Sequence, residues 1–65
     1  MDEAEAREII KAQGWTPYIH RVKKWVYIEA ARKVKGTRRT KKKHIAALHK
    51  LDQLTKEDII RKLTT

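Results

Sequence analysis

Apolar residues near the N-terminus recur three and four positions apart, which is the spacing of one face of a helix. Ala6, Ile9 and Ile10 form this stripe. The first turn is acidic, and the dipole of a helix stabilises carboxylates at that end. Gly14 follows the last turn, where glycine commonly terminates a helix. The pattern predicts a helix from Asp2 to Gln13 whose narrow apolar stripe packs against another element.

A second helix is predicted from Lys56 to Leu63, near the other end of the chain. Thr55 precedes it and an acid follows three residues later, which is the spacing of a capping box. Leu54 stands where an apolar residue can pack onto Ile59 as a hydrophobic staple. Ile59, Ile60 and the last leucine give this helix one apolar face.

Between the two helices the pattern changes to short runs of aromatic and β-branched residues, which favour strands. Tyr18 to Val22 and Trp25 to Ile28 are two such runs. Gly36 lies between extended segments and, with Lys35, indicates a tight hairpin turn. Residues 38–43 (RRTKKK) suit an edge strand, because charged side chains discourage pairing with other chains. The sequence therefore predicts an α+β fold, in which a three-stranded antiparallel sheet is flanked by an N-terminal and a short C-terminal helix.

A turn at Lys35 and Gly36 fixes the expected register of the last two strands. Trp15 is expected in the core, where it joins the first helix to the sheet. The expected cross-strand pairs are Glu29 with Lys42, Tyr27 with His44, and Ile28 with Lys43.

Residues two positions apart in a strand share a face of the sheet. Val26, Ile28 and Ala30 form the face on which the helices are expected, since small and branched residues let a helix approach closely. Trp25 and Tyr27 fall on the opposite face. A core position is the alternative for these two aromatic residues, because the chain contains no Phe.

A long helix is the alternative for the central stretch. Thr16 would be its N-cap, Pro17 its first residue and Gly36 the glycine after its end. Against this helix, Lys33 would lie within the apolar face and Tyr27 would project from the opposite side. The alternative fold is thus an all-α small helical bundle.

The chain of 65 residues is long enough for one small domain, residues 1–65. It contains no cysteine, so neither a disulfide nor a thiolate metal site stabilises it, and this composition fits a reducing cytoplasm. The N-terminus starts acidic, unlike a signal peptide, and no apolar run approaches the ~20 residues that cross a bilayer. We expect a cytoplasmic, nucleoid-associated protein without a membrane partner.

Positive charge dominates the composition, with a formal net charge of +9. Between Ala12 and Lys50, twelve lysines and arginines face a single acid, Glu29. So much like charge opposes a compact fold and indicates an anionic partner. Because cations near phosphates release counterions, nucleic acid is the predicted partner, with double-stranded DNA favoured over RNA in a regulatory or architectural role. The alternatives are an RNA-binding protein, or an adaptor or inhibitor that docks its basic face on an acidic protein.

The side chains predicted to contact nucleic acid divide by chemistry. Arginine carries a planar fork that can read a guanine edge, whereas lysine is better suited to orienting the phosphate backbone. Trp25 and Tyr27 would supply flat contacts for sugars or bases. The predicted nucleic-acid-binding residues are Arg21, Lys23, Lys24, Trp25, Tyr27, Arg32, Lys33, Lys35, Arg38, Arg39, Lys41, Lys42 and Lys43.

The chain resembles, over one segment, the strand-turn-strand of the plant ethylene-response-factor and integrase arm-binding types of DNA-binding domain. This segment consists of residues 25–32 (WVYIEAAR) followed by residues 35–38 (KGTR). In those families a three-stranded sheet backed by a helix lies in the major groove, and basic and aromatic residues on its strands touch the DNA. The resemblance implies contact positions for Trp25, Arg32 and Arg38.

No catalytic, metal or cofactor site is predicted from the sequence. The spacings of His20, His44 and His49 match no familiar ligand pattern, so these residues are expected to be scattered over the surface. The chain has no Ser, no Cys, no glycine-rich phosphate loop and no paired carboxylates in an apolar setting. An enzyme is therefore not expected, and a homodimer or a protein partner is left open.

Overall fold

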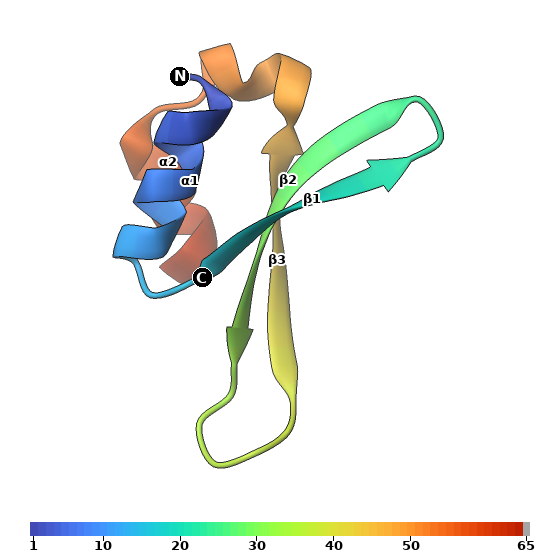
Figure 1. Ribbon diagram of the computed structural model, residues 1–65. Coiled ribbons are helices and arrows are strands. Elements are labelled where there is room, and N and C mark those ends of the chain that lie inside the picture. The colour runs from blue at the N-terminus through green and yellow to red at the C-terminus, as the bar shows by residue number, and fades with distance from the viewer. Residues whose placement is uncertain (65) are drawn as a thin grey trace.

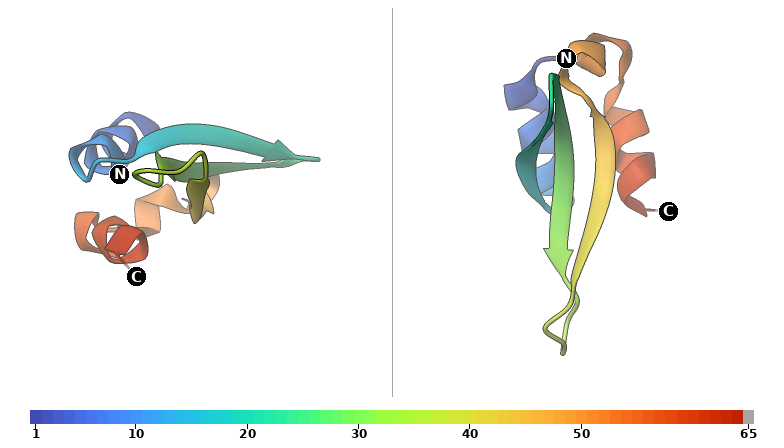
Figure 2. Two further views of the ribbon diagram at one scale, coloured as in Figure 1. Left: turned by 90° about the horizontal axis from the view of Figure 1, so that it is seen from below. Right: turned by 90° about the vertical axis from the view of Figure 1, so that its right-hand side faces the viewer.

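The computed structural model describes residues 1–64 and has the predicted α+β fold. Three antiparallel strands in the order β1-β2-β3 form one sheet, and both helices lie on one face of it (Figure 1 and the right-hand view of Figure 2). The alternative all-α bundle is wrong, because residues 16–33 pair as a hairpin. The elements are α1 (Glu3–Ala12), β1 (Thr16–Val22), β2 (Trp25–Lys33), β3 (Thr40–Ala47), a 3₁₀ helix η1 (Leu48–Gln53) and α2 (Lys56–Thr64).

Helix α1 is one residue shorter at each end than predicted, because Asp2 and Gln13 are its caps. The Asp2 carboxylate accepts a hydrogen bond of 2.8 Å from the backbone N–H of Glu5, which satisfies one of the free donors of the first turn. Gly14 follows the helix with a φ of +84°, a left-handed conformation that glycine adopts at little cost. Ala6 and Ile10 are fully buried, so the apolar stripe faces the rest of the domain.

Helix α2 begins with the predicted capping box. The Thr55 hydroxyl accepts a hydrogen bond from the N–H of Asp58 at 3.2 Å, and the Asp58 carboxylate accepts one from the N–H of Thr55 at 3.0 Å. Hydrogen bonding of the Asp58 carboxylate to the backbone N–H and the side chain of Thr55 lowers the pKa of this carboxyl below its usual value. Ile59 and Leu63 are buried, and Leu54 packs against the margin of the core.

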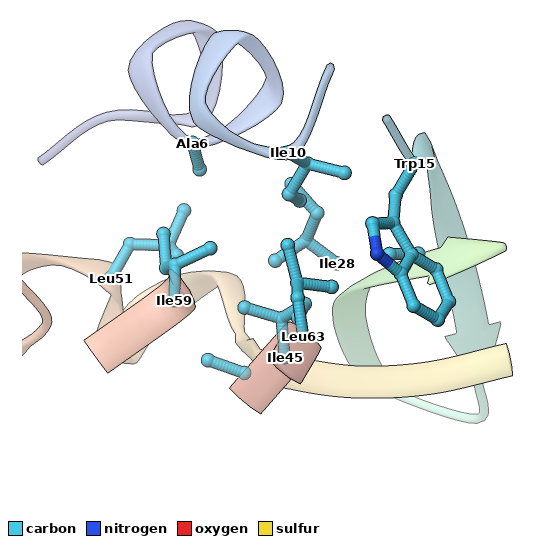
Figure 3. Close-up of a cluster of buried hydrophobic side chains, with 10 residues drawn as sticks. Ala6, Ile10, Trp15, Ile28, Ile45, Leu51, Ile59 and Leu63 are labelled. Atoms are coloured by element: carbon cyan, nitrogen blue, oxygen red, sulfur yellow. The ribbon is translucent and has the colours of Figure 1, made fainter. Parts of the chain in front are cut away.

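The core lies between the helices and the inner face of the sheet (Figure 3). Trp15 is only 5% exposed and belongs to it, as predicted. Leu51 also joins the core and belongs to η1, an element that the sequence did not predict. Helices α1 and α2 and strands β2 and β3 each contribute one fully buried isoleucine, which are Ile10, Ile59, Ile28 and Ile45.

The turn between β2 and β3 is longer than predicted. The loop spans residues 34–39 and is closed by a hydrogen bond of 2.9 Å from the N–H of Val34 to the carbonyl of Arg39. Gly36 adopts a φ of +80° within it. The expected two-residue turn is therefore wrong, and with it the expected register. The observed pairs are Tyr27 with Ala47, Ile28 with Ala46, Glu29 with His44, Ala30 with Lys43 and Ala31 with Lys42.

A β-bulge in β3 contributes to the change of register. Ile45 has no partner, because Ile28 pairs with Ala46 and the next residue, Glu29, pairs with His44. A bulge lets two residues of one strand oppose one residue of its neighbour. As a result, Ile45 and Ala46 both belong to the core.

Two hairpin ends extend beyond the helices, in different directions (Figure 1). One is the β1–β2 turn, formed by Lys23 and Lys24, in which Lys23 has a φ of 54°. The other is the far part of the β2–β3 hairpin, residues 31–43, which we call the hairpin arm. We call the face of the sheet that points away from the helices the open face. No helix within residues 1–64 is long and apolar enough to cross a membrane.

Candidate nucleic-acid interface

The hairpin arm gathers eight of the predicted cations and contains no acid. Lys35, Arg38 and Arg39 lie in its loop and are exposed. The remaining cations lie on its two strands, β2 and β3. The eight residues are Arg32, Lys33, Lys35, Arg38, Arg39, Lys41, Lys42 and Lys43.

The register divides the strand cations of the arm between two faces. Ala30 is buried on the helix side and pairs with Lys43, so this lysine lies on the helix side as well. Arg32 and its partner Lys41 are two positions further along the strands and share that side. Lys33 and Lys42 are out of phase with them and lie on the open face. Both faces of the arm are therefore positively charged.

An open pocket of about 670 Å³ lies at the base of the arm. The Arg32 guanidinium lies over the Trp15 ring, 4.7 Å from its centroid, and this cation–π contact fixes the arm to the core. The pocket is lined by the arm residues Arg32, Lys41, Lys42 and Lys43, by Trp15, and by Gln13, Leu63 and Thr64 at the ends of the two helices.

The remaining predicted cations do not join the arm. Arg21, Lys23 and Lys24 lie at the β1–β2 end of the sheet, which is the opposite end of β2. At ~3.3 Å per residue, the nine residues of β2 separate the two groups by roughly 26 Å. The predicted cations therefore lie at two ends of the sheet and not on one surface, because antiparallel hairpins place successive turns at opposite ends of the shared strand.

The aromatic residues Trp25 and Tyr27 lie on the open face, outside the core cluster. Trp25 is 44% exposed, and its ring centroid lies 5.3 Å from that of His49. Tyr27 is half-buried and meets the ring of His44 edge-on at 5.1 Å. A core role for the two aromatic residues is therefore wrong. Together with Ala47, His49 and Lys50, they line an open pocket beside the end of β3, which we call the aromatic shelf.

Glu29 connects three side chains at the centre of the open face. Its Oε1 accepts a hydrogen bond of 2.8 Å from the Tyr18 hydroxyl and lies 3.2 Å from His20 Nδ1. Its Oε2 lies 3.1 Å from His44 Nδ1. A carboxylate can only accept, so each imidazole carries its proton on Nδ1 and leaves Nε2 available. We call these four residues the Glu29 cluster.

The hydrogen bonds of the cluster affect two pKa values. Partial burial favours the neutral form of Glu29, but the hydrogen bonds from His44, Tyr18 and His20 together lower its pKa below the usual value. Burial, followed by the hydrogen bond to Glu29 and the charge of that carboxylate, raises the pKa of the Tyr18 hydroxyl. Glu29 is therefore ionised at neutral pH and Tyr18 is a neutral donor.

The Glu29 cluster was missed from the sequence, where the histidines were interpreted as scattered. That interpretation is wrong for His20 and His44, which share one carboxylate. The signal was partly present, since Tyr18 and His20 are two positions apart and so share a face of β1. His44 was out of reach, because the expected register placed it opposite Tyr27. Within residues 1–64, no group of three or more His, Cys, Asp or Glu side chains is arranged to hold a metal ion.

No family model, curated protein or solved structure matches the chain.

Proposed function

We propose that this protein binds double-stranded DNA by inserting the hairpin arm into the major groove, in a regulatory or architectural role. The observation that carries the proposal is the exposed arm with cations on both faces and no acid. The major groove of B-form DNA is about 12 Å wide and admits a two-stranded β-ribbon, with phosphates along both of its walls. A ribbon charged on both faces fits that setting better than one charged on a single face.

Duplex DNA is the better fit for the arm than duplex RNA. The major groove of A-form RNA is deep and narrow, and side chains cannot reach its bases. On the arm, Arg38 and Arg39 lie in the loop and would meet the base edges first, while Lys41 and Lys42 would contact phosphates. The hydrogen bond between Val34 and Arg39 restrains the loop backbone and so limits the entropy lost on binding.

The proposal is tested by fluorescence anisotropy with a short labelled DNA duplex and an RNA duplex of the same sequence. We expect the double variant Arg38→Ala/Arg39→Ala to weaken DNA binding by roughly tenfold or more, at about 1–3 kcal/mol for each arginine that reads a guanine, and to relax sequence preference. Lys56→Ala is the matched control, since Lys56 is an exposed cation at the start of α2, away from the arm. Equal losses in the two variants, or DNA affinity that does not change with salt, would contradict the proposal.

A second candidate function is binding of single-stranded RNA on the open face. The exposed Trp25 ring, with His49 beside it, is the observation that favours it, since bases stack on such rings at about 1–3 kcal/mol each. Binding should quench the fluorescence of Trp25, while the buried Trp15 is shielded. Trp25→Phe should abolish the quenching, and a signal that persists in this variant would exclude the open face.

A further inference from the structure

The Glu29 cluster holds two imidazoles on one exposed surface, one on each side of the Glu29 carboxylate. His20 and His44 come from the outer strands β1 and β3, and both direct Nδ1 at the carboxylate of the central strand. Their side chains are 48% and 54% exposed, whereas Glu29 is 17% exposed. Because Nδ1 is engaged, the nitrogen of each ring that remains for another molecule is Nε2. Tyr27 pairs with His20 across the strands and contacts the His44 ring, so it lies between the two imidazoles.

We propose that His20 and His44 form a general acid–base pair that cleaves single-stranded RNA. The inference goes beyond duplex binding by the arm and rests on the second candidate function, access of a single strand to the open face. Neutral Nε2 of one histidine takes the proton of the ribose 2′-hydroxyl, and the 2′-oxygen forms a bond to the adjacent phosphorus. The bond from phosphorus to the 5′-oxygen breaks, and the protonated Nε2 of the other histidine donates its proton to that oxygen. The products are a 2′,3′-cyclic phosphate and a free 5′-hydroxyl, with no water, metal or oxidant consumed.

The surroundings of the two histidines suit a phosphodiester and the nucleotides on either side of it. Lys42 lies on the open face two residues before His44 and can hold the phosphate. In the other direction along the sheet, Trp25 and His49 form the aromatic shelf on which a base can stack. A strand that follows the open face from the arm to this shelf therefore passes over the Glu29 cluster.

Glu29 is a positioning residue in this site, because it touches the imidazoles rather than the substrate. It fixes the tautomer of both rings, because the Nδ1–H of each imidazole donates to its carboxylate. Tyr18 in turn holds the carboxylate through its hydroxyl. Substitution of Glu29 removes these hydrogen bonds and a negative charge beside both rings, so it should change the dependence of the rate on pH as well as the maximal rate.

The experiment uses the full chain with EDTA and a single-stranded RNA that carries a fluorophore and a quencher, beside a DNA strand of the same sequence. We expect cleavage of the RNA alone, with 2′,3′-cyclic phosphate ends and a bell-shaped dependence on pH. His20→Ala and His44→Ala should each lower the rate by about 10²–10⁴-fold, the usual contribution of a general acid or base. Lys56→Ala is the control, since Lys56 is exposed on α2, on the other side of the sheet from the two histidines, and it should retain the wild-type rate.

Three outcomes would overturn the inference: no cleavage of RNA, equal cleavage of DNA, or an unchanged rate in His20→Ala and His44→Ala. Glu29→Gln with a lower rate but an unshifted pH profile would restrict the carboxylate to a structural role and overturn its positioning role.

An RNA with 2′-O-methyl groups tests the chemistry without any variant, since it should bind and quench Trp25 but resist cleavage. If ordinary RNA binds but is not cleaved, only the proposed acid–base pair is contradicted. If it does not bind, the second candidate function, binding of single-stranded RNA on the open face, is contradicted as well. Duplex binding by the arm is measured separately and should be unaffected in His20→Ala.

Discussion

Glu29 is the only acid between Ala12 and Lys50, and its position at the centre of the sheet gives it a stabilising role. Its hydrogen bonds join all three strands, since Tyr18 and His20 belong to β1 and His44 to β3. Hydrogen bonds to a charged group contribute more than those between neutral groups. The Glu29 carboxylate thus adds side-chain hydrogen bonds between the strands to those of the backbone.

The lowered pKa of Glu29 predicts a loss of stability in acid. A carboxyl whose pKa is lower in the folded state stabilises the fold above its unfolded pKa, and this contribution disappears as the pH falls through the folded value. The loss should therefore begin near the ordinary value of 4.5 and continue below it. Glu29→Gln should be less stable than wild type by roughly 1 kcal/mol at neutral pH, and the difference should shrink at pH values below that range.

Urea unfolding of both proteins across this pH range checks the prediction. Asp58 also has a lowered pKa, but both proteins contain it, so the difference between them isolates Glu29. A difference that stays constant from neutral pH into acid would show that the charge of Glu29 contributes nothing to stability.

Single residues were predictable where the pattern around them is local. Ala6 and Ile10 are predicted on the inner stripe of α1 from their spacing, and Trp15 is predicted in the core from its place between the first helix and the sheet. These assignments are confirmed. The hydrogen-bond partners of Glu29 could not be predicted in the same way, because they depend on which residue of β3 lies opposite Glu29. The two histidines are separated by most of the sheet in sequence, and only the correct register brings them together.

At the scale of elements, the capping box of α2 gives a direct test. Thr55→Ala removes the hydroxyl that accepts the N–H of Asp58 and should destabilise the protein by about 1 kcal/mol. Thermal or urea unfolding measures the loss. Thr37→Ala serves as a comparison, because the Thr37 hydroxyl bonds only within the exposed arm loop, to the Val34 carbonyl and the Arg39 N–H. Equal losses in both variants would contradict a specific role for the cap.

The helices were predicted accurately and the last strand was not, for a physical reason. A helix is bounded by contacts within a few residues, such as the bonds of Asp2 and Thr55, and these are visible in the sequence. The length of a hairpin loop depends on both strands at once. Gly36 does lie in the turn, but the six residues of the loop and the bulge at Ile45 are set by how β3 packs under the helices.

At the scale of the whole molecule, the cations form two groups at opposite ends of β2. If the arm alone enters the groove, the two groups should contribute differently to DNA binding. Lys42→Ala should lower the slope of log affinity against log salt by about 0.9, the value for one phosphate contact. Lys24→Ala, at the other end of the sheet, should leave the slope nearly unchanged. Anisotropy titrations at several salt concentrations measure both slopes, and equal decreases would mean that DNA spans the whole length of the sheet.

The bulge at Ile45 also determines which side chains of β3 point to the open face of the sheet. Side chains alternate between the two faces along a regular strand. The extra residue at the bulge therefore gives the side chains of residues 40–44 the opposite faces from those that a regular β3 would give them. If Ile45 instead paired regularly with Glu29, His44 and Lys42 would turn toward the helices, and Lys43 and Lys41 would take their places on the outer surface. A β3 strand of the same composition and net charge, but without the bulge, would thus lose the contact between the His44 imidazole and the Glu29 carboxylate.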